Sequence, residues 1–279
     1  MIEFCVCMEY TDEIKDELLL TAKEKQGMKL DFDYHNHTHL SRCSRKDYTV
    51  EEMLQMMREK GLRHVGFSDH FYADETVPAE NVALVRAAAA NFPEMDVYAG
   101  VEADMLWPGH LTATAETLSP YDYVSVACPH WHSNEVARPL CLTPDSLAQA
   151  QYDMLLSLAE MAYVDVIVHP FTFGQAQGYM EVDQEALMQR YTLGDYDRLI
   201  DGLLKNQIAV ELHANLKKPH YARSLLPFLT RCVSRGVHFS MGSDAHELKW
   251  VGSILGAREY IDGLQIPDEL AFRPKKKSE

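Results

Sequence analysis

Five segments of the chain share one pattern, in which an apolar run rich in β-branched residues ends in a histidine or a carboxylate. They cover residues 30–39, 64–70, 97–102, 164–169 and 237–246. Short apolar runs of this kind are typical of strands buried on both faces. In a strand, residues i and i+2 point to the same face, so His35 and His37 can aim two imidazoles at one point. An isolated pair with this spacing is commonly a chance feature of the surface, but the four later segments favour a metal site.

The stretches between these runs have the periodicity of helices, and the two kinds of element alternate along the chain. Helices are expected over residues 50–60, 80–91, 143–162, 185–205 and 222–235, and further strands over 123–126 and 208–212. Alternation of strand and helix is typical of a parallel sheet. The chain holds about seven such units, against eight in a complete (β/α)8 barrel. The sequence therefore predicts an α/β fold, a distorted (β/α)7 TIM-like barrel.

The length of 279 residues suits one large domain, because α/β barrels of this size are commonly a single unit. We expect an N-terminal appendage over residues 1–29 with a helix near 11–25, and the barrel domain over 30–265. Residues 266–279 are expected to form a frayed, solvated tail, since they include a proline and three consecutive lysines. No apolar run approaches the roughly 20 residues of a membrane span, so no membrane contact is expected.

The charge of the chain limits the partners that it can attract. The formal net charge is −16, from 26 Lys and Arg against 42 Asp and Glu. This balance disfavours long nucleic acids and anionic membranes, so an anionic substrate must be captured by metal ions or a few arginines. The six cysteines are scattered, without the spacing of a zinc or redox pair and without a secretory segment ahead of them. Reduced thiols and a cytoplasmic location are therefore expected.

Nearly half of the histidines lie at or just beyond the ends of expected strands. They are His35, His37, His70, His130, His169 and His246, six of the 13 in the chain. In a parallel barrel the loops that follow the strands form one active site at the carboxyl ends. Histidines that only pack in a core would also be scattered over helices. These six therefore predict a single site.

Taken together, the motifs resemble the polymerase and histidinol phosphatase (PHP) domain, and within it the histidinol-phosphatase-like branch. The matching segments are residues 35–37, 66–70, 100–104, 165–170 and 242–247. They span most of the chain and are specific in combination. The resemblance implies a distorted seven-stranded barrel and two or three divalent transition-metal ions, which are zinc, iron or manganese. It also implies hydrolysis of a phosphate ester by metal-activated hydroxide, with a place in histidine biosynthesis.

The resemblance also implies three groups of metal ligands that share one bridging carboxylate. The first ion would be held by His35, His37, Glu102 and Asp244. The second would be held by Glu102, His130 and His169. The third would be held by His70 and His246. Asp244 and His246 are the implied catalytic residues, because one of them manages the proton of the reaction. Asp69 and Asp104 are expected to orient ligands rather than bind metal.

At two positions the chain leaves a choice between candidate ligands. The family usually has a third-metal histidine eight positions after the first motif histidine, where this chain has Cys43. Thiolate replaces imidazole on zinc or iron, so Cys43 is the expected ligand and His39 is the alternative. After the strand over residues 123–126, both His130 and His132 are candidates, and the spacing from the strand end favours His130.

The sequence favours a phosphomonoesterase of histidinol-phosphatase type that hydrolyses a small phosphorylated metabolite and releases inorganic phosphate. Four residues are candidates for contacting the substrate: Arg42, Arg45, His213 and Arg223. Arginine grips phosphate oxygens through two hydrogen bonds at once. One alternative is a PHP phosphodiesterase or nuclease acting on nucleotides or oligonucleotides. A second alternative is a non-catalytic metal-binding regulatory module, which Cys43 keeps open.

Overall fold

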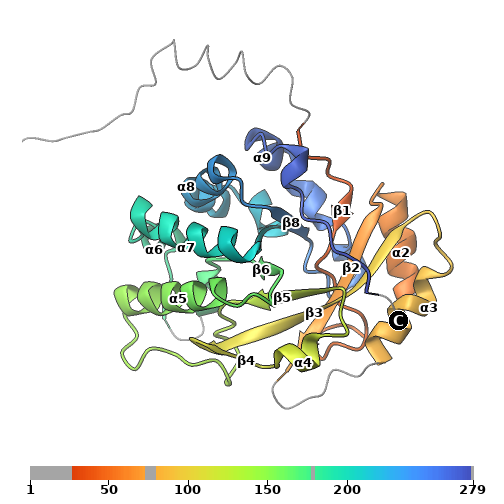
Figure 1. Ribbon diagram of the computed structural model, residues 1–279, viewed down its shortest axis with the longest axis horizontal. Helices are drawn as coiled ribbons and strands as arrows, with labels where there is room; N and C mark the ends of the chain where they lie inside the picture. Colours follow the sequence, from red (N-terminus) through yellow and green to blue (C-terminus); the bar gives the residue numbers. More distant parts are fainter. Residues whose placement is uncertain (1–26, 73–79, 177–179, 278–279) are drawn as a thin grey trace, which may run out of the picture.

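Seven parallel strands form one sheet that curves into a nearly closed barrel, with the helices around the outside (Figure 1). The structure is a computed structural model that describes residues 27–72, 80–176 and 180–277. The helix expected near residues 11–25 lies outside these ranges. Neighbouring strands follow the order β1-β2-β3-β5-β6-β7-β8. The predicted distorted (β/α)7 TIM-like barrel is confirmed.

The strands and helices alternate along the chain as the sequence predicts. The parallel strands are β1 (Phe32–Asp33), β2 (His64–Phe71), β3 (Asp96–Trp107), β5 (Tyr123–Ala127), β6 (Val166–Val168), β7 (Ala209–His213) and β8 (Phe239–Gly242). The helices are α2 (Val50–Glu59), α3 (Glu80–Ala89), α4 (Ala115–Leu118), α5 (Pro144–Ala159), α6 (Gln184–Met188), α7 (Leu193–Asn206), α8 (Pro219–Arg235) and α9 (Arg258–Gly263). The short strand β4 (His110–Leu111) pairs with the end of β3 in the antiparallel direction.

The barrel closes between β8 and the residues that follow β1. The Asp244 N–H donates to the His35 carbonyl at 2.8 Å, and the His37 N–H donates to the Ala245 carbonyl at 2.9 Å. The strand expected to run through residue 39 is thus shorter, since β1 ends at Asp33. Single backbone hydrogen bonds, rather than a continuous ladder, hold the two histidines at the barrel end.

Side-chain caps fix where the helices begin. The Thr49 hydroxyl accepts a hydrogen bond from the Glu52 N–H, and the Glu52 carboxylate accepts one from the Thr49 N–H, which is a capping box before α2. The helix expected over residues 185–205 is two helices, α6 and α7. The second begins after Thr192, whose hydroxyl accepts from the Asp195 N–H, so the cap at Thr192 marks the division of the segment.

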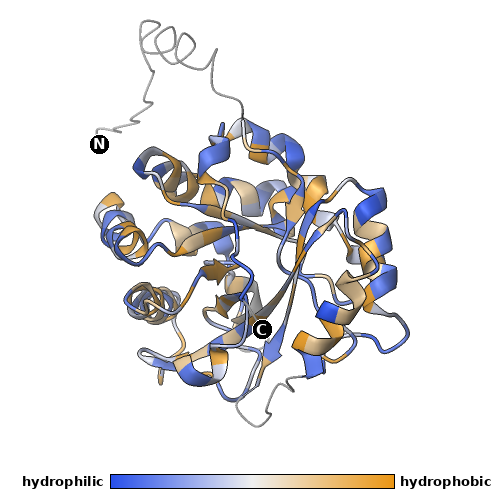
Figure 2. Cartoon of the chain, turned by 45° about the vertical axis from the view of Figure 1, so that its right-hand side comes forward, coloured by the Kyte–Doolittle hydropathy of each residue, from blue (hydrophilic) through white to orange (hydrophobic). Residues whose placement is uncertain are grey.

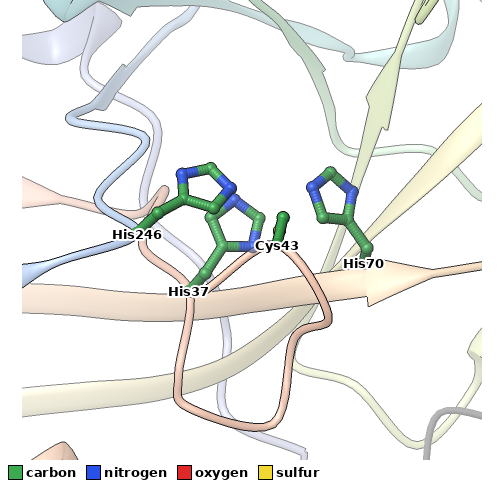
Figure 3. Close-up of side chains that lie close together, drawn as sticks. All are labelled: His37, Cys43, His70 and His246. Atoms are coloured by element: carbon green, nitrogen blue, oxygen red, sulfur yellow. The ribbon is translucent and has the colours of Figure 1, made fainter. Parts of the chain in front are cut away.

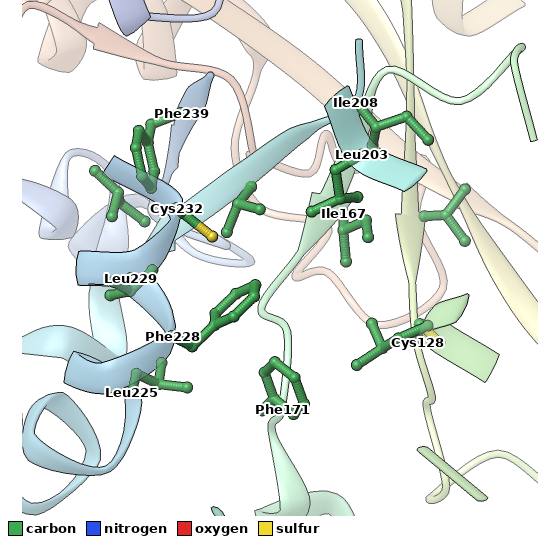
Figure 4. Close-up of a cluster of buried hydrophobic side chains, with 14 of the residues drawn as sticks. Cys128, Ile167, Phe171, Leu203, Ile208, Leu225, Phe228, Leu229, Cys232 and Phe239 are labelled. Atoms are coloured by element: carbon green, nitrogen blue, oxygen red, sulfur yellow. The ribbon is translucent and has the colours of Figure 1, made fainter. Parts of the chain in front are cut away.

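Apolar side chains fill both the barrel and the layer between strands and helices. Figure 2 shows hydrophobic residues in the strands and both kinds of residue on the surrounding helices. Inside the barrel, the Tyr123 ring lies over Gly66 and Gly100, where an added Cβ would approach it to 2.3 and 2.1 Å. Figure 4 shows the outer layer, where Ile167 of β6 and Phe228 of α8 are buried together. No helix in the described part of the chain is long and apolar enough to cross a membrane.

The C-terminal residues pack against the barrel, and the frayed tail expected there is wrong for residues 266–277. The Phe272 N–H donates to the Phe239 carbonyl at 2.8 Å, which adds a hydrogen bond at the start of β8. The Arg273 guanidinium lies 4.3 Å from the centre of the Phe32 ring, a distance at which a cation is attracted to the ring face. The sequence does not indicate these contacts, because the residues that pack against the barrel lie just before a polar run of lysines.

Candidate metal centre

The carboxyl ends of the strands converge on one carboxylate, Glu102 of β3, which is 1% exposed. Its Oε2 atom lies 3.2 Å from His35 Nε2 and 3.4 Å from His37 Nε2. Its Oε1 atom lies 3.2 Å from His169 Nε2 and 3.7 Å from His130 Nε2. His70 Nδ1 also lies 3.1 Å from Oε2, so Oε2 faces three imidazoles and Oε1 faces two others. This is the arrangement required of a carboxylate shared by two cations.

All nine predicted ligands belong to groups whose donor atoms lie within 4.8 Å of one another. Two of the groups contain Glu102: His35, His37 and Glu102, and Glu102, His130 and His169. A third group lies next to them and consists of His35, His169 and Asp244. The other two are His37, Cys43, His70 and His246, and His70, Asp104 and His130. The barrel therefore brings together residues that are more than 200 positions apart in the sequence.

Figure 3 shows the group that contains the cysteine. Cys43 lies in the loop between β1 and α2, and its thiol joins the imidazoles of His37, His70 and His246. Burial raises the pKa of this thiol to about 11, although a hydrogen bond with the Tyr72 hydroxyl acts in the opposite direction. A metal ion would have to displace the thiol proton in order to bind here.

The structure separates the candidates that the sequence left open. Cys43 belongs to a group of ligand-type atoms, and among the described residues His39 belongs to none. His130 is buried in two groups, whereas His132 is exposed and its ring lies 5.0 Å from the His130 ring. The choice of Cys43 and His130 as ligands stays a prediction, and these are the two candidates that lie among other ligand-type atoms.

Hydrogen bonds on the far side of several rings fix which nitrogen faces the centre. The Nδ1 atom of His35 lies 2.7 Å from Glu211 Oε1, and the Nδ1 atom of His246 lies 3.0 Å from the Asp244 carbonyl. Carboxylate and carbonyl oxygens only accept hydrogen bonds, so each Nδ1 carries a proton and donates it. In a neutral imidazole this leaves Nε2 with a lone pair, which is the state that binds metal.

The loop after β1 orients His37 by a similar device. The Asp69 carboxylate of β2 accepts hydrogen bonds from the Thr38 N–H at 2.6 Å and from the Ser41 hydroxyl at 2.7 Å. Since the Ser41 proton is used in this way, its oxygen accepts from His37 Nδ1, 3.4 Å away. Asp69 therefore acts through the loop. Asp104 instead contacts a predicted ligand directly, because its Oδ1 atom lies 2.6 Å from His130 Nδ1.

Glu211 of β7 was missed by the sequence analysis, although it is central to the site. One oxygen faces His35 Nδ1, and the other accepts a hydrogen bond from the His169 N–H at 2.6 Å. Gly242 of β8 gives it room, because a Cβ there would lie 1.9 Å from Glu211 Oε1. A signal was present: Glu211 lies two residues before His213 in one strand, so both side chains point to the same face.

Burial and charge oppose each other throughout the centre. Burial by itself disfavours a charged imidazole, yet the charges of Glu211 and Glu102 raise the pKa of His35 well above its ordinary value. The pKa of His37 is instead lowered to about 3 by burial and by the neighbouring imidazoles. Burial raises the pKa of Asp244, but the adjacent histidines hold it well below its ordinary value. The centre thus holds ionised carboxylates that require positive charge.

The spacing of the nitrogen atoms fits a shared cation. The Nε2 atoms of His35 and His37 are 3.2 Å apart, and those of His130 and His169 are 3.3 Å apart. Two imidazole nitrogens that bind one zinc ion at about 2.05 Å, with a tetrahedral angle, are about 3.3 Å apart. Imidazole and carboxylate together suit zinc, iron and manganese. The donor set and its spacing therefore fit divalent transition metals.

Comparison with known proteins agrees with these motifs. The family model of the PHP domain matches residues 33–214, which is more than half of the chain. The chain belongs to the PHP domain family. None of the curated proteins matches it.

Two solved structures share the fold of this PHP domain. One is histidinol phosphate phosphatase (HisK) from Lactococcus lactis subsp. lactis Il1403, solved with zinc, L-histidinol and phosphate. It is 18% identical, with a TM-score of 0.66, over 84% of this chain and 93% of that one. The other is the putative histidinol phosphatase from Listeria monocytogenes, 13% identical with a TM-score of 0.51, over 79% of this chain and 97% of that one.

The residues expected to contact substrate lie in different parts of the PHP domain. Arg42 lies against the ring of Tyr72, with its guanidinium carbon 3.9 Å from the ring centre, beside the group that contains Cys43. Arg45 forms an exposed ion pair of 3.0 Å with Asp47. Arg223 instead lines a groove of about 460 Å³ between α8 and α9. His213, at the end of β7, lies 3.5 Å from Asp244.

Proposed function

We propose that this PHP domain is a metal-dependent phosphomonoesterase of histidinol-phosphatase type. The observation that carries the proposal is the position of Glu102, whose two oxygens face separate sets of imidazoles, three at Oε2 and two at Oε1, at 3.1–3.7 Å. Divalent ions bound at such a centre lower the pKa of water and neutralise the charge that develops on a phosphoryl group. The protein residues position the reacting groups and move protons around them.

In this proposal, two or three zinc, iron or manganese ions are held by the nine clustered side chains. The first ion takes His35, His37, Glu102 and Asp244. The second takes Glu102, His130 and His169. The third takes Cys43, His70 and His246. A shared carboxylate offsets the repulsion between two cations, which is the reason for assigning that role to Glu102.

Asp244 and His246 are proposed to manage the protons of the reaction. The side chain of Asp244 is 29% exposed and that of His246 is 27% exposed, whereas Glu102 is buried. These two groups therefore lie on the side of the centre that a substrate reaches. The low pKa of Asp244 keeps its carboxylate ionised at neutral pH, so it can accept a hydrogen bond from the group whose proton is moved. His246 donates its Nδ1 proton to the Asp244 carbonyl, so its Nε2 would manage the proton when two ions are bound and would hold the third ion when three are bound.

A small phosphate ester is the proposed substrate, with L-histidinol phosphate as the first compound to test and inorganic phosphate as the product. The chain shares its fold with a histidinol phosphate phosphatase solved with L-histidinol and phosphate. Its net charge of −16 would repel the many phosphate charges of a nucleic-acid backbone. A small ester that carries a single phosphate group would be repelled much less. Arg42, which lies beside the cysteine-containing group, is the proposed phosphate contact among the arginines.

The proposal is tested by comparing substrates with protein loaded with zinc, iron or manganese in turn. We expect kcat/KM for L-histidinol phosphate to exceed that for a nucleoside monophosphate and that for a short oligonucleotide. Inorganic phosphate should inhibit competitively. Preference for the oligonucleotide would refute the phosphomonoesterase proposal in favour of a nuclease. Full metal loading without turnover of any ester would favour a regulatory module.

A further inference from the structure

His213 differs from the other histidines at the centre in the hydrogen bond that its ring makes. It lies at the C-terminal end of β7 and is 7% exposed, with its ring 5.6 Å from the His169 ring. Its Nδ1 atom accepts a hydrogen bond from the Asn215 N–H at 3.1 Å. By contrast, His35 and His246 direct Nδ1 at oxygen acceptors.

This hydrogen bond decides the tautomer of His213. A backbone N–H can only donate, so Nδ1 of His213 must carry a lone pair. In the neutral ring the proton then lies on Nε2. A protonated Nε2 cannot bind a metal ion, which separates His213 from the proposed ligands even though it lies beside them.

The Nε2 atom of His213 faces the side of Asp244 that the other histidines leave open. It is buried, lies 3.5 Å from Asp244 Oδ2, and has no hydrogen-bond partner at shorter range among the described residues. The other oxygen, Oδ1, lies 3.1 Å from His37 Nε2 and 3.4 Å from His35 Nε2. The two oxygens of Asp244 are thus divided between ligand imidazoles on one side and a donor imidazole on the other.

The backbone of Asp244 is fixed, and its carboxylate is only partly covered by the ligand imidazoles. The Asp244 N–H donates to the His35 carbonyl, and the residue has a φ of 53°, in the left-handed region. The side chain is 29% exposed, and its Oδ2 atom needs a donor on that side to fix the orientation of the carboxylate. His213 occupies the position from which such a donor would act.

We propose that His213 is a positioning residue whose Nε2–H donates to Asp244 Oδ2, leaving Oδ1 alone to bind the ion shared with His35 and His37. The inference rests on the proposed metal centre, and it replaces the expected substrate contact of His213 with a contact to a ligand. A carboxylate that binds through one oxygen leaves a coordination position open, which a catalytic site requires. Groups that orient a ligand in this way typically contribute 10–100-fold to metal affinity.

Two substitutions separate a donor from a ligand. His213→Gln keeps an N–H group of similar reach, whereas His213→Leu removes every donor at a similar volume. We expect the metal affinity of H213L, measured by competition with a chelator, to fall by about 10- to 100-fold. The affinity of H213Q should stay within about threefold of wild type. His238→Leu is the matched control, because His238 is exposed at the other end of the barrel, next to β8.

The tautomer itself is read directly by ¹⁵N NMR of the full chain with labelled histidine, with His213 assigned from its absence in H213Q. We expect a protonated Nε2 and an unprotonated Nδ1 in both the metal-free and the zinc-loaded protein. A metal-bound Nε2, or equal loss of affinity in H213L and H213Q, would overturn the proposal. Unchanged affinity in both variants would overturn it as well. Failure of wild-type protein to bind metal would instead refute the metal centre, and the metal-free spectrum would still test the tautomer.

Discussion

Glu211→Gln is a small change in shape that should disturb the metal centre strongly. In the native protein, Oε1 accepts from His35 Nδ1 at 2.7 Å and Oε2 accepts from the His169 N–H at 2.6 Å. Glutamine offers one acceptor oxygen and one NH2 donor. The His169 N–H cannot change its role, so the amide oxygen must face it and the NH2 group must face His35.

His35 then has to reverse its tautomer. Its Nδ1 atom would accept from the glutamine NH2, the proton would move to Nε2, and the lone pair that faces Glu102 would be lost. The cost is about one hydrogen bond to a charged group, roughly 1.5–3 kcal/mol. At 1.36 kcal/mol per factor of ten, this corresponds to about a 10- to 150-fold loss of metal affinity.

The assay is competition between the protein and a chelator of known affinity, followed by metal analysis of the protein fraction. Glu259→Gln serves as the matched control, because Glu259 is an exposed residue of α9. Circular dichroism of both variants checks that the barrel is folded. If E211Q holds its metal ions as tightly as E259Q, the argument that Glu211 sets the tautomer of His35 is refuted.

Three further predictions concern other parts of the molecule. Glu102→Gln should lose metal and activity together, because the negative charge shared by the imidazoles on its two sides disappears. A fully metallated and active E102Q, by elemental analysis and turnover, would show that the centre lies elsewhere. Cys43→Ser should remove one metal ion selectively, and in the cobalt-loaded protein it should also remove the sulfur-to-cobalt absorption band. Cys43→His should restore the ion without restoring the band. Unchanged metal occupancy in both variants would show that Cys43 does not bind metal. Burial raises the pKa of Asp33 to about 6, only partly offset by hydrogen bonds from Ser243, so the metal-free folded state binds this proton more tightly than the unfolded state. Relative to Asp33→Asn, the free energy of unfolding should therefore fall by roughly 2 kcal/mol as the pH rises from about 4 to about 6, and a flat difference in denaturant titrations would contradict this assignment.

The sequence indicated most of the candidate site because a parallel barrel places the carboxyl ends of all its strands at one end. His70, Glu102 and His169 each end an apolar run, and the alternation of strands with helices makes those ends meet. This reasoning needs only local periodicity and the direction of the strands, both of which are encoded within a few residues.

Side-chain direction at the ends of strands was less accessible to the sequence. Cys43 and His39 lie in the same loop, and tertiary hydrogen bonds such as those from Thr38 and Ser41 to Asp69 fix the path that brings the thiol to the cluster. The C-terminal residues were misjudged for a related reason. Their polar composition suggests a free end, whereas the structure supplies Phe32 and Phe239 as partners from distant strands.

Periodicity and strand ends indicated the fold class and the histidines that gather at one site of this PHP domain, and the resemblance to the family supplied the complete set of candidate ligands, Cys43 among them. The tertiary structure decided how those ligands are held and which nitrogen each histidine turns toward the centre. Glu211 and His35 are 176 positions apart, and they meet only because the barrel closes and Gly242 leaves space between them. The 2.7 Å hydrogen bond between His35 Nδ1 and Glu211 Oε1 depends on the relative position of whole strands, which local sequence patterns do not specify.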